Sequence, residues 1–465
     1  MTYSFDQGGR DQAIAKSDYY FLNRFNDDLA SLVAVRSESQ DPAFAGELRR
    51  YLVEMIVPLV DQCGFTTSME ATADGSPILL ASRIENPEFG TILIYGHGDV
   101  CAPDTRSWRE GLDPYLLTVE GDRIYGRGSA DNKAQHLINL KALFAVLQQK
   151  GSLGFNVKLV METSEEIGSP GLREFFTANA DRLSADVLIA SDGPRLRSNV
   201  PTMFLGSRAA FNFDLRVNLR ERAYHSGNFG GLLADPAIIL AHAISSIADA
   251  RGQIRISEWR PKSLTDDFRA SIASLPLPEG GPDVDHSWGE QGLTPIERAF
   301  GWNSFAVLSM LSGSPASPQN AIAGSAVATC QLRYVVGTDP AEILPALRRH
   351  LDDNGYEAVQ VVGRREDAVP ATRFPLNHPW VEFVADSIAA SSGMRPDILP
   401  NLAGSLPNDA FTEILNLPTI WIPHSYAGCC QHAPNEHVLG TLVRDALRNM
   451  TGLFWDIGER RGKVR

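Results

Sequence analysis

The segment TILIYGHGD, residues 91–99, decides the fold. An apolar run from Thr91 to Tyr95 stops abruptly at the polar group Gly96-His97-Gly98-Asp99. Two further apolar runs end in the same way, in NVKLVMETSEE (156–166) and DVLIASDG (186–193). Short apolar runs bounded by polar residues are typical of buried strands. The sequence therefore predicts three strands whose ends carry His97, Glu165, Glu166 and Asp192.

Helices are predicted between these strands. The stretch from Lys133 to Lys150 carries apolar residues at helical spacing, and Gly151 is a natural stop. Strands that alternate with helices favour an α/β fold with a mostly parallel sheet covered by helices. The same pattern returns near the end of the chain, with a helix predicted at 378–391 and a strand at 417–422.

The middle of the chain has a different pattern, which begins at about Gly206. Phe211 to Val217 alternates apolar and polar residues, as a half-buried strand does. Further strands are predicted at 305–311 and 326–336, helices at 236–250 and 339–354, with Pro345 interrupting the second helix, and a loop at 260–292. We therefore expect an inserted α+β lid or dimerisation domain at 206–371, between two parts of a catalytic domain at 1–205 and 372–465.

Composition excludes several classes of protein. A length of 465 residues favours two domains. The 42 Lys and Arg against 56 Asp and Glu give a net charge of −14, which does not suit binding to nucleic acid or to an anionic membrane surface. The sequence contains no apolar stretch of about 18 residues, so no membrane span is expected. The amino terminus, Met1 to Arg10, shows no secretory signal.

The five cysteines are scattered and odd in number. Such a set argues against a disulfide framework and favours a reducing compartment, so a cytoplasmic location is expected. Cys429 and Cys430 lie close to a candidate ligand, but buried bystander thiols are preferred to a metal role for them.

The polar residues at the strand ends point to metal chemistry. Ligands of open α/β sheets bind beyond the carboxyl ends of the strands, so His97, Glu165, Glu166 and Asp192 are expected at one rim. Asp131, at the start of a helix, and His432, after the last strand, are expected to join them. Two histidines with several carboxylates suit a divalent ion such as Zn²⁺ or Mn²⁺.

The spacing of these residues suggests different roles. Asp131 is the natural bridge between two ions, because its two oxygens can face different metals. Asp99, two residues after His97, could accept the other N–H of that imidazole. One member of the Glu165–Glu166 pair could bind a metal while the other moves a proton from a metal-activated water. Each motif alone is weak, but their ordered occurrence at strand ends predicts a metal site.

The order His97-X-Asp99, Asp131, Glu165-Glu166, Asp192, His432 resembles the dinuclear zinc metallopeptidases that include carnosinase, aminoacylase and succinyl-diaminopimelate desuccinylase. The resemblance covers nearly the whole chain. It implies that His97, Asp131 and Asp192 hold one metal ion and that Asp131, Glu166 and His432 hold the other. It further implies that Glu165 is the general base, that Asp99 orients His97, and that the Asp131–Asn132 peptide bond is cis. The expected cofactors are two Zn²⁺ ions, with Mn²⁺ or Co²⁺ as alternatives.

The inserted segment resembles the lid of this family, which commonly dimerises. Tyr224-His225-Ser226-Gly227 looks like the lid histidine motif, and the resemblance implies that His225 reaches across a homodimer to stabilise the oxyanion. Asn320 and Arg333 match positions that grip the substrate. Arg suits a carboxylate because its fork binds two oxygens at once. Gly404-Ser405-Leu406-Pro407 resembles a loop that holds the carboxylate end of the substrate.

One departure from the family pattern bears on the substrate. Carnosinase-like dipeptidases often carry a Glu, able to bind a free amine, where this chain has Leu402. The expected reaction is therefore hydrolysis of the amide bond of an N-acyl amino acid or a blocked dipeptide. A free-amine dipeptide, or an unusual amide or aryl amine, is the alternative. A non-catalytic binding protein on the same scaffold competes with these enzymes, but it would be expected to lack some of the ligands.

Overall fold

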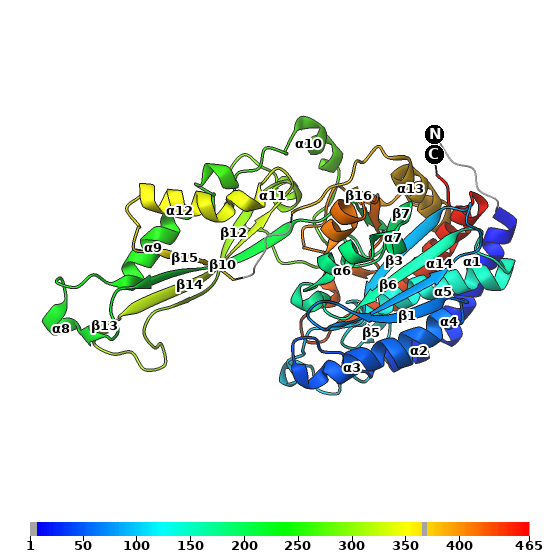
Figure 1. The fold of residues 1–465 in the computed structure, drawn as a ribbon, viewed down its shortest axis with the longest axis horizontal. Helices are drawn as coiled ribbons and strands as arrows, with labels where there is room; N and C mark the ends of the chain where they lie inside the picture. Colours follow the sequence, from blue (N-terminus) through cyan, green and yellow to red (C-terminus); the bar gives the residue numbers. More distant parts are fainter. Residues whose placement is uncertain (1–6, 365–369, 465) are drawn as a thin grey trace.

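The computed structural model describes residues 7–364 and 370–464 in two units (Figure 1). One unit is built on an eight-stranded sheet, and the other, elongated unit is built on a four-stranded antiparallel sheet. The predicted α/β fold with an inserted α+β segment is confirmed. Residues 1–6 lie outside the described ranges, so the expectation about an amino-terminal signal rests partly on residues that are not described.

The eight-stranded sheet has the order β1-β2-β6-β3-β7-β17-β9-β16. Its central strands β6, β3, β7 and β17 run parallel to one another, and β9 is parallel to β16. The strands are β1 (Thr66–Ala71), β2 (Pro77–Arg83), β3 (Thr91–His97), β6 (Asn156–Glu162), β7 (Val187–Ala190), β9 (Thr202–Phe204), β16 (Asp397–Leu399) and β17 (Thr419–Trp421). The mostly parallel sheet predicted from the apolar runs is therefore present.

Both faces of this sheet are buried, which explains the unbroken apolar runs. On β3, Ile92 and Ile94 belong to the core under one face, whereas Leu93 and Tyr95 belong to the core under the other. Successive strand residues point to opposite faces, so a strand covered on both sides needs apolar residues at every position. The polar residues that follow such a run then lie at the edge of the sheet where the strand ends.

Four long helices pack together over one side of the sheet (Figure 1). They are α1 (Gln7–Asn23), α5 (Lys133–Lys150), α13 (Pro379–Ser392) and α14 (Gly440–Glu459). Helix α5 has the bounds predicted from the sequence, and Gly151 ends it with a φ of 77°, a conformation that favours glycine. Segments at the two ends of the chain thus lie side by side.

The inserted unit has the strand order β12-β14-β10-β15, with helices α9 and α12 packed against it. Its strands are β10 (Ala209–Asn218), β12 (Ser304–Leu311), β14 (Ser325–Tyr334) and β15 (Gln360–Gly363), and its two larger helices are α9 (Pro236–Ile247) and α12 (Ile343–Asp353). Pro345 does not interrupt α12, because it lies in the first turn, where backbone N–H groups have no helical partner. At the end of this unit, β11 (Tyr224–His225) pairs antiparallel with β13 (Ala321–Ile322) in a small two-stranded sheet.

One part of the expected loop at 260–292 is wrong. Residues Asp266–Ile272 form helix α10, whose N-cap Thr265 accepts a hydrogen bond from the backbone N–H of Phe268. Phe268 and Ile272 are buried four residues apart. In the sequence, the surrounding Pro and Gly residues favour a loop more strongly than the short apolar spacing favours a helix.

The remaining elements are short. The helices are α2 (Phe25–Val33), α3 (Ala45–Arg50), α4 (Val57–Asp61), α6 (Leu172–Ala178), α7 (Ala180–Leu183), α8 (Ser226–Phe229) and α11 (Pro295–Gly301). The strands are β4 (Thr118–Glu120), β5 (Arg123–Tyr125), β8 (Pro194–Arg195), β18 (Ser425–Tyr426) and β19 (His437–Leu439). The π-helical segments are Tyr51–Ile56 and Ala410–Ile414, and the 3₁₀ turns are 42–44, 105–107, 165–167, 257–259, 340–342 and 427–429.

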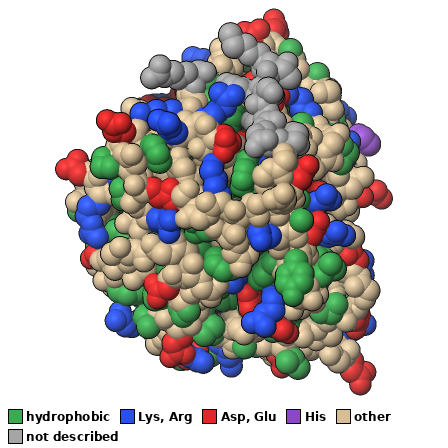
Figure 2. All heavy atoms as spheres, turned by 90° about the vertical axis from the view of Figure 1, so that its right-hand side faces the viewer, with side chains coloured by type: hydrophobic (Ala, Val, Ile, Leu, Met, Phe, Trp, Pro, Cys, Tyr) green, Lys and Arg blue, Asp and Glu red, His purple; other side chains and the backbone are tan. Residues whose placement is uncertain are grey.

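The surface at the end of the unit with the eight-stranded sheet carries acidic and basic side chains mixed together (Figure 2). Lys and Arg do not gather into one patch on this face. None of the described helices is long and apolar enough to cross a membrane. All five cysteines are free thiols in the described structure.

Candidate metal centre

Side chains from five segments meet beyond the carboxyl ends of β3, β6 and β7. His97 ends β3, and Glu165 and Glu166 lie in the 3₁₀ turn that follows β6. Asp192 follows β7, Asp131 lies just before α5, and His432 lies in the loop after β18. The structure therefore places the six expected metal-site and base residues around one rim.

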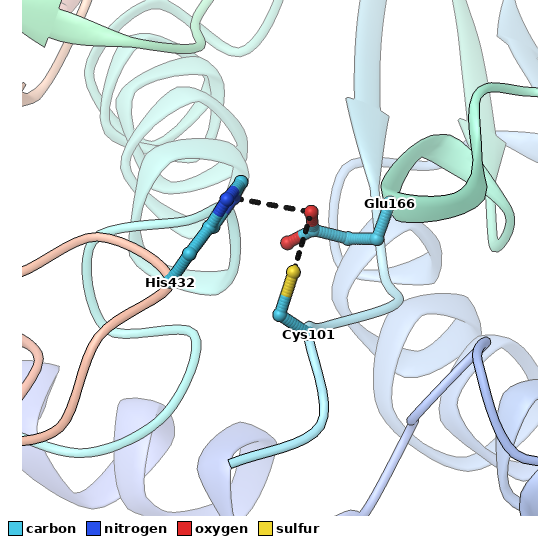
Figure 3. Close-up of side chains that lie close together, drawn as sticks. All are labelled: Cys101, Glu166 and His432. Carbon is cyan, nitrogen blue, oxygen red and sulfur yellow. Dashed lines mark hydrogen bonds and ion pairs between the residues drawn. The ribbon is translucent and has the colours of Figure 1, made fainter. Parts of the chain in front are cut away.

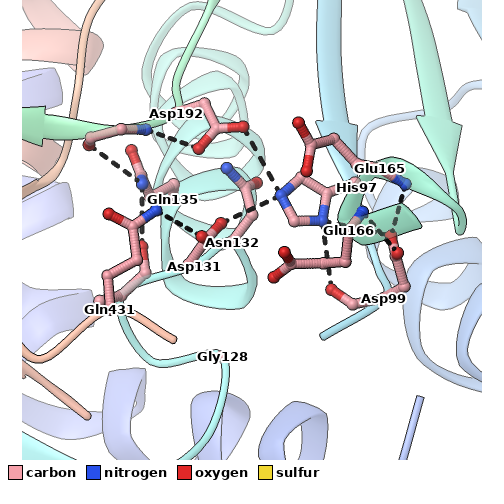
Figure 4. A network of polar contacts seen from close by, with 12 residues as sticks. His97, Asp99, Gly128, Asp131, Asn132, Gln135, Glu165, Glu166, Asp192 and Gln431 are labelled. Carbon is pink, nitrogen blue, oxygen red and sulfur yellow. Dashed lines mark hydrogen bonds and ion pairs between the residues drawn. The ribbon is translucent and has the colours of Figure 1, made fainter. Parts of the chain in front are cut away.

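The first group of potential ligands is fully buried. His97 Nε2 lies 3.1 Å from Asp131 Oδ1 and 3.5 Å from Asp192 Oδ2. Figure 4 shows the two carboxylates facing the same edge of the imidazole. One nitrogen and two carboxylate oxygens within this range form a set that could hold a divalent cation.

The second group lies on the other side of Asp131. His432 Nε2 lies 2.8 Å from Asp131 Oδ2 and 3.1 Å from Glu166 Oε2. The two oxygens of Asp131 therefore face two different histidines, Oδ1 towards His97 and Oδ2 towards His432. A carboxylate that bridges two ions requires this arrangement.

Asp99 connects His97 to the glutamate turn. Its Oδ1 lies 3.3 Å from His97 Nδ1, and its backbone carbonyl lies 3.1 Å from the same nitrogen. The carboxylate also accepts the backbone N–H groups of Glu165 and Glu166, at 3.2 and 3.0 Å (Figure 4). Asp99 can thus fix the imidazole tautomer and the position of both glutamates.

The electrostatics of the centre favour positive charge. Burial is the largest cause that raises the pKa of Glu165, Glu166 and Asp192, and neighbouring carboxylates raise the pKa of all three further. Hydrogen bonds to Asp131 and other neighbours raise the pKa of His432. In addition, Glu166 Oε1 is buried and has no hydrogen-bond partner among the described residues. A buried carboxylate oxygen without a partner is costly, and a bound cation would satisfy it, so these residues fit divalent metal ions.

Glu436 is a supporting residue to which no sequence motif assigned a role. Its buried carboxylate accepts the backbone N–H groups of Gly128, Ala130 and Asp131, at 2.9 to 3.1 Å. It also forms a buried ion pair of 2.6 Å with Arg127. The loop that carries His432 is thereby tied to the segment that carries Asp131. The Asp131–Asn132 peptide bond is cis, as the resemblance implied.

A pocket of about 410 Å³ opens beside the ligands. Glu165, Asp131, Asp192 and His432 line one part of it, and the remaining wall is mostly apolar. Arg333 from the inserted unit and Ser405 from the unit with the eight-stranded sheet meet at this pocket, where Arg333 Nη1 donates to Ser405 Oγ at 3.3 Å. Gly404 and Leu402 also line the pocket.

Two expected site residues lie elsewhere. His225 and Asn320 are exposed and lie together at the small two-stranded sheet β11-β13 at the end of the inserted unit, where Ser226 N donates to Asn320 O at 2.9 Å. In Figure 1 this small sheet lies at the far end of the molecule from β3 and β6. Neither residue therefore reaches the metal centre of its own chain in this conformation.

The sequence pattern that defines "Peptidase family M20/M25/M40" matches residues 93–454. The chain belongs to this family. It is thus a metallopeptidase of the M20 type, a hydrolase of a dinuclear-metal family, and the predicted family and enzyme class are confirmed. Members of the M20 family bind divalent metals, and the two ligand groups described above are the candidate site.

Individual relatives are dipeptidases. The human "Beta-Ala-His dipeptidase" is 26% identical in an alignment of 454 positions that covers 90% of this chain and 86% of that protein. The "Cysteinylglycine-S-conjugate dipeptidase" of Corynebacterium striatum is 29% identical over 235 residues, 50% of this chain and 51% of that protein. The crystal structure of human carnosine dipeptidase 1 covers 97% of this chain and 99% of its own, with a TM-score of 0.81 and 21% identity, and it supports the fold.

Proposed function

We propose that this protein is a dipeptidase that hydrolyses a peptide bond with a water activated by two divalent metal ions. The observation that carries the proposal is the position of Asp131, whose two oxygens face His97 and His432 separately. In this proposal His97, Asp131 and Asp192 hold one ion, and Asp131, Glu166 and His432 hold the other. The nitrogen and oxygen donors suit Zn²⁺, with Mn²⁺ or Co²⁺ as alternatives.

Glu165 is proposed as the general base. It lines the pocket but belongs to neither ligand group. Two bound cations would lower the pKa of a shared water and polarise the scissile carbonyl. Glu165 would accept the proton of that water and deliver it to the nitrogen of the leaving amine. Asp99 would keep His97 and the glutamate turn in place during both transfers.

Metal removal tests this function. We expect the purified protein to contain two divalent ions per chain and to hydrolyse dipeptides such as β-Ala-His or Cys-Gly. Chelation should abolish hydrolysis, and readdition of Zn²⁺ or Mn²⁺ should restore it, because the water would otherwise keep its ordinary pKa. Metal content is measured by elemental analysis beside the release of the free amino acid. Full activity in protein shown to be free of metal would refute the proposal.

The carboxylate end of the substrate is proposed to bind Arg333 and Ser405. Both line the pocket, and the guanidinium donates to the hydroxyl. Replacing the substrate carboxylate by a methyl ester or amide should lower kcat/KM by about 10–150-fold, because a charged hydrogen bond contributes roughly 1.5–3 kcal/mol. Arg333→Ala should cause a similar loss with the acid but little further loss with the ester. Equal rates on acid and ester in the unmodified enzyme would exclude this clamp.

The amine end distinguishes two kinds of substrate. The dipeptidase names of the relatives favour a free-amine dipeptide over the N-acyl compounds suggested by the sequence. One observation supports the N-acyl alternative: Leu402 lines an otherwise apolar part of the pocket. Rates on matched pairs of a dipeptide and its N-acetyl form decide between them. Faster hydrolysis of the free dipeptide would support the dipeptidase, and faster hydrolysis of the acetyl form would support the alternative.

A homodimer is part of the proposal. Strand β12 is at the edge of the four-stranded sheet, and it exposes Val307, Leu308, Met310 and Leu311. A long, apolar edge strand is a ready partner for a second copy of the same strand. In the proposed dimer, the small sheet β11-β13 with His225 and Asn320 would reach the pocket of the other chain, because these residues do not reach the pocket of their own.

A further inference from the structure

Cys101 lies against the second group of ligands. Its Sγ is 3.0 Å from Glu166 Oε2, and the sulfur, that carboxylate and the ring of His432 form one compact cluster (Figure 3). The three side chains come from different segments: the loop after β3, the turn after β6 and the loop after β18. Nothing in the assigned function uses the thiol.

A second observation at the same place points to a bound cation. The Glu166 side chain is only 3% exposed, and its Oε1 has no hydrogen-bond partner within the described parts of the chain. His432 Nε2 lies 3.1 Å from the other oxygen of the same carboxylate. The carboxylate is therefore almost wholly buried, yet one of its two oxygens accepts no hydrogen bond from the described residues.

The thiol is held in this position by Gln40, which comes from an earlier segment of the chain. Gln40 Nε2 lies 3.7 Å from Cys101 Sγ, and Gln40 Oε1 accepts the backbone N–H of Ala102 at 3.1 Å. One residue thus contacts both the sulfur and the adjoining backbone. Cys101 is also only partly buried, so it is not one of the chain's fully enclosed, inert thiols such as Cys63 and Cys330.

We propose that Cys101 is a sulfur ligand of the second metal site, beside Glu166, His432 and the bridging Asp131. The inference rests on the proposed two-metal function and adds a residue that its ligand set lacks. Binding converts the thiol to a thiolate, with the proton released to solvent and the sulfur lone pair donated to the ion. No oxidant or reductant takes part.

A thiolate would make the two sites chemically unequal. The first site offers one imidazole and two carboxylates, whereas the second would offer sulfur, nitrogen and oxygen donors. Soft thiolate donors favour Zn²⁺, while oxygen donors suit Mn²⁺. The second site is therefore expected to retain Zn²⁺ when the first site exchanges its ion for Mn²⁺.

Cobalt substitution tests the ligand directly. The full chain loaded with two Co²⁺ ions should show a sulfur-to-cobalt charge-transfer absorption in the near ultraviolet. Cys101→Ser should remove this band and weaken one of the two zinc sites by about tenfold or more, a loss of the size found for metal-site partners. The matched control is Cys430→Ser, since Cys430 is also partly buried and lies two residues from His432. The control should retain the band.

A measurement on the unmodified protein covers the case in which the variant does not fold. Iodoacetamide should alkylate Cys101 readily in the metal-free protein and slowly after addition of Zn²⁺, as followed by mass spectrometry of the peptide. Three results would each overturn the assignment of Cys101 as a ligand: two bound Co²⁺ ions without the band, a band that survives Cys101→Ser, or alkylation that Zn²⁺ does not slow. Each of them would leave the proposed function intact. Failure to bind any metal would overturn both.

Discussion

The Glu165→Gln variant is expected to keep two metal ions per chain and to hydrolyse its substrate about 10²–10⁴-fold more slowly. The amide retains the size of the side chain but cannot accept a proton from water. Glu165 lies in the pocket and outside both ligand groups, so the metals should be unaffected. Single-turnover rates together with elemental analysis of the same samples measure both quantities.

The neighbouring glutamate is the matched control for this experiment. Glu166→Gln makes the same chemical change one residue away, but Glu166 Oε2 is 3.1 Å from His432 Nε2 in the second ligand group. This variant should lose affinity for one ion, and excess metal should restore part of its activity. Excess metal should not rescue Glu165→Gln. A Glu165→Gln enzyme that keeps both metals and full activity would show that the base is another residue.

The positions of the candidate ligands at the rim could be predicted because strand ends are local features of the sequence. The unbroken apolar run of β3 sets His97 at the rim, and the same holds for Asp192 after β7. Parallel strands then bring these ends together without any further information. The role of Arg333 and Ser405 could be predicted only from the family resemblance. The two residues lie 72 positions apart and in different units, so no local pattern indicates their contact.

Other parts of the centre depend on contacts that the sequence does not display. The Glu436 carboxylate accepts hydrogen bonds from backbone N–H groups of a loop more than 300 residues earlier, so its role appears only in the folded chain. In the sequence, Cys429 and Cys430 lie near His432, whereas the sulfur that lies 3.0 Å from Glu166 Oε2 belongs to Cys101, 65 residues before that glutamate. Nearness in sequence to one candidate ligand does not show which thiol contacts another.

Replacing His225 by Ala is expected to lower the hydrolysis rate by about 10²–10³-fold, the effect of removing one oxyanion donor. The imidazole is exposed on β11 of the inserted unit and does not reach the candidate metal centre of its own chain. Its loss should leave the metal content unchanged. His242→Ala is the matched control, because His242 is an exposed histidine on α9 of the same unit, and this variant should be fully active.

Mixing two inactive variants would show from which chain the histidine acts. In a dimer of Glu165→Gln with His225→Ala, one pocket has an intact Glu165 from its own chain and an intact His225 from the partner, while the other pocket lacks both. Random exchange of equal amounts gives mixed dimers in half of the population, each with one working pocket, so about one quarter of full activity should return. Subunit exchange is followed by mass-tagged chains. If exchange is complete and no activity returns, His225 does not complete the partner's site, and the two units of one chain would have to close on each other instead.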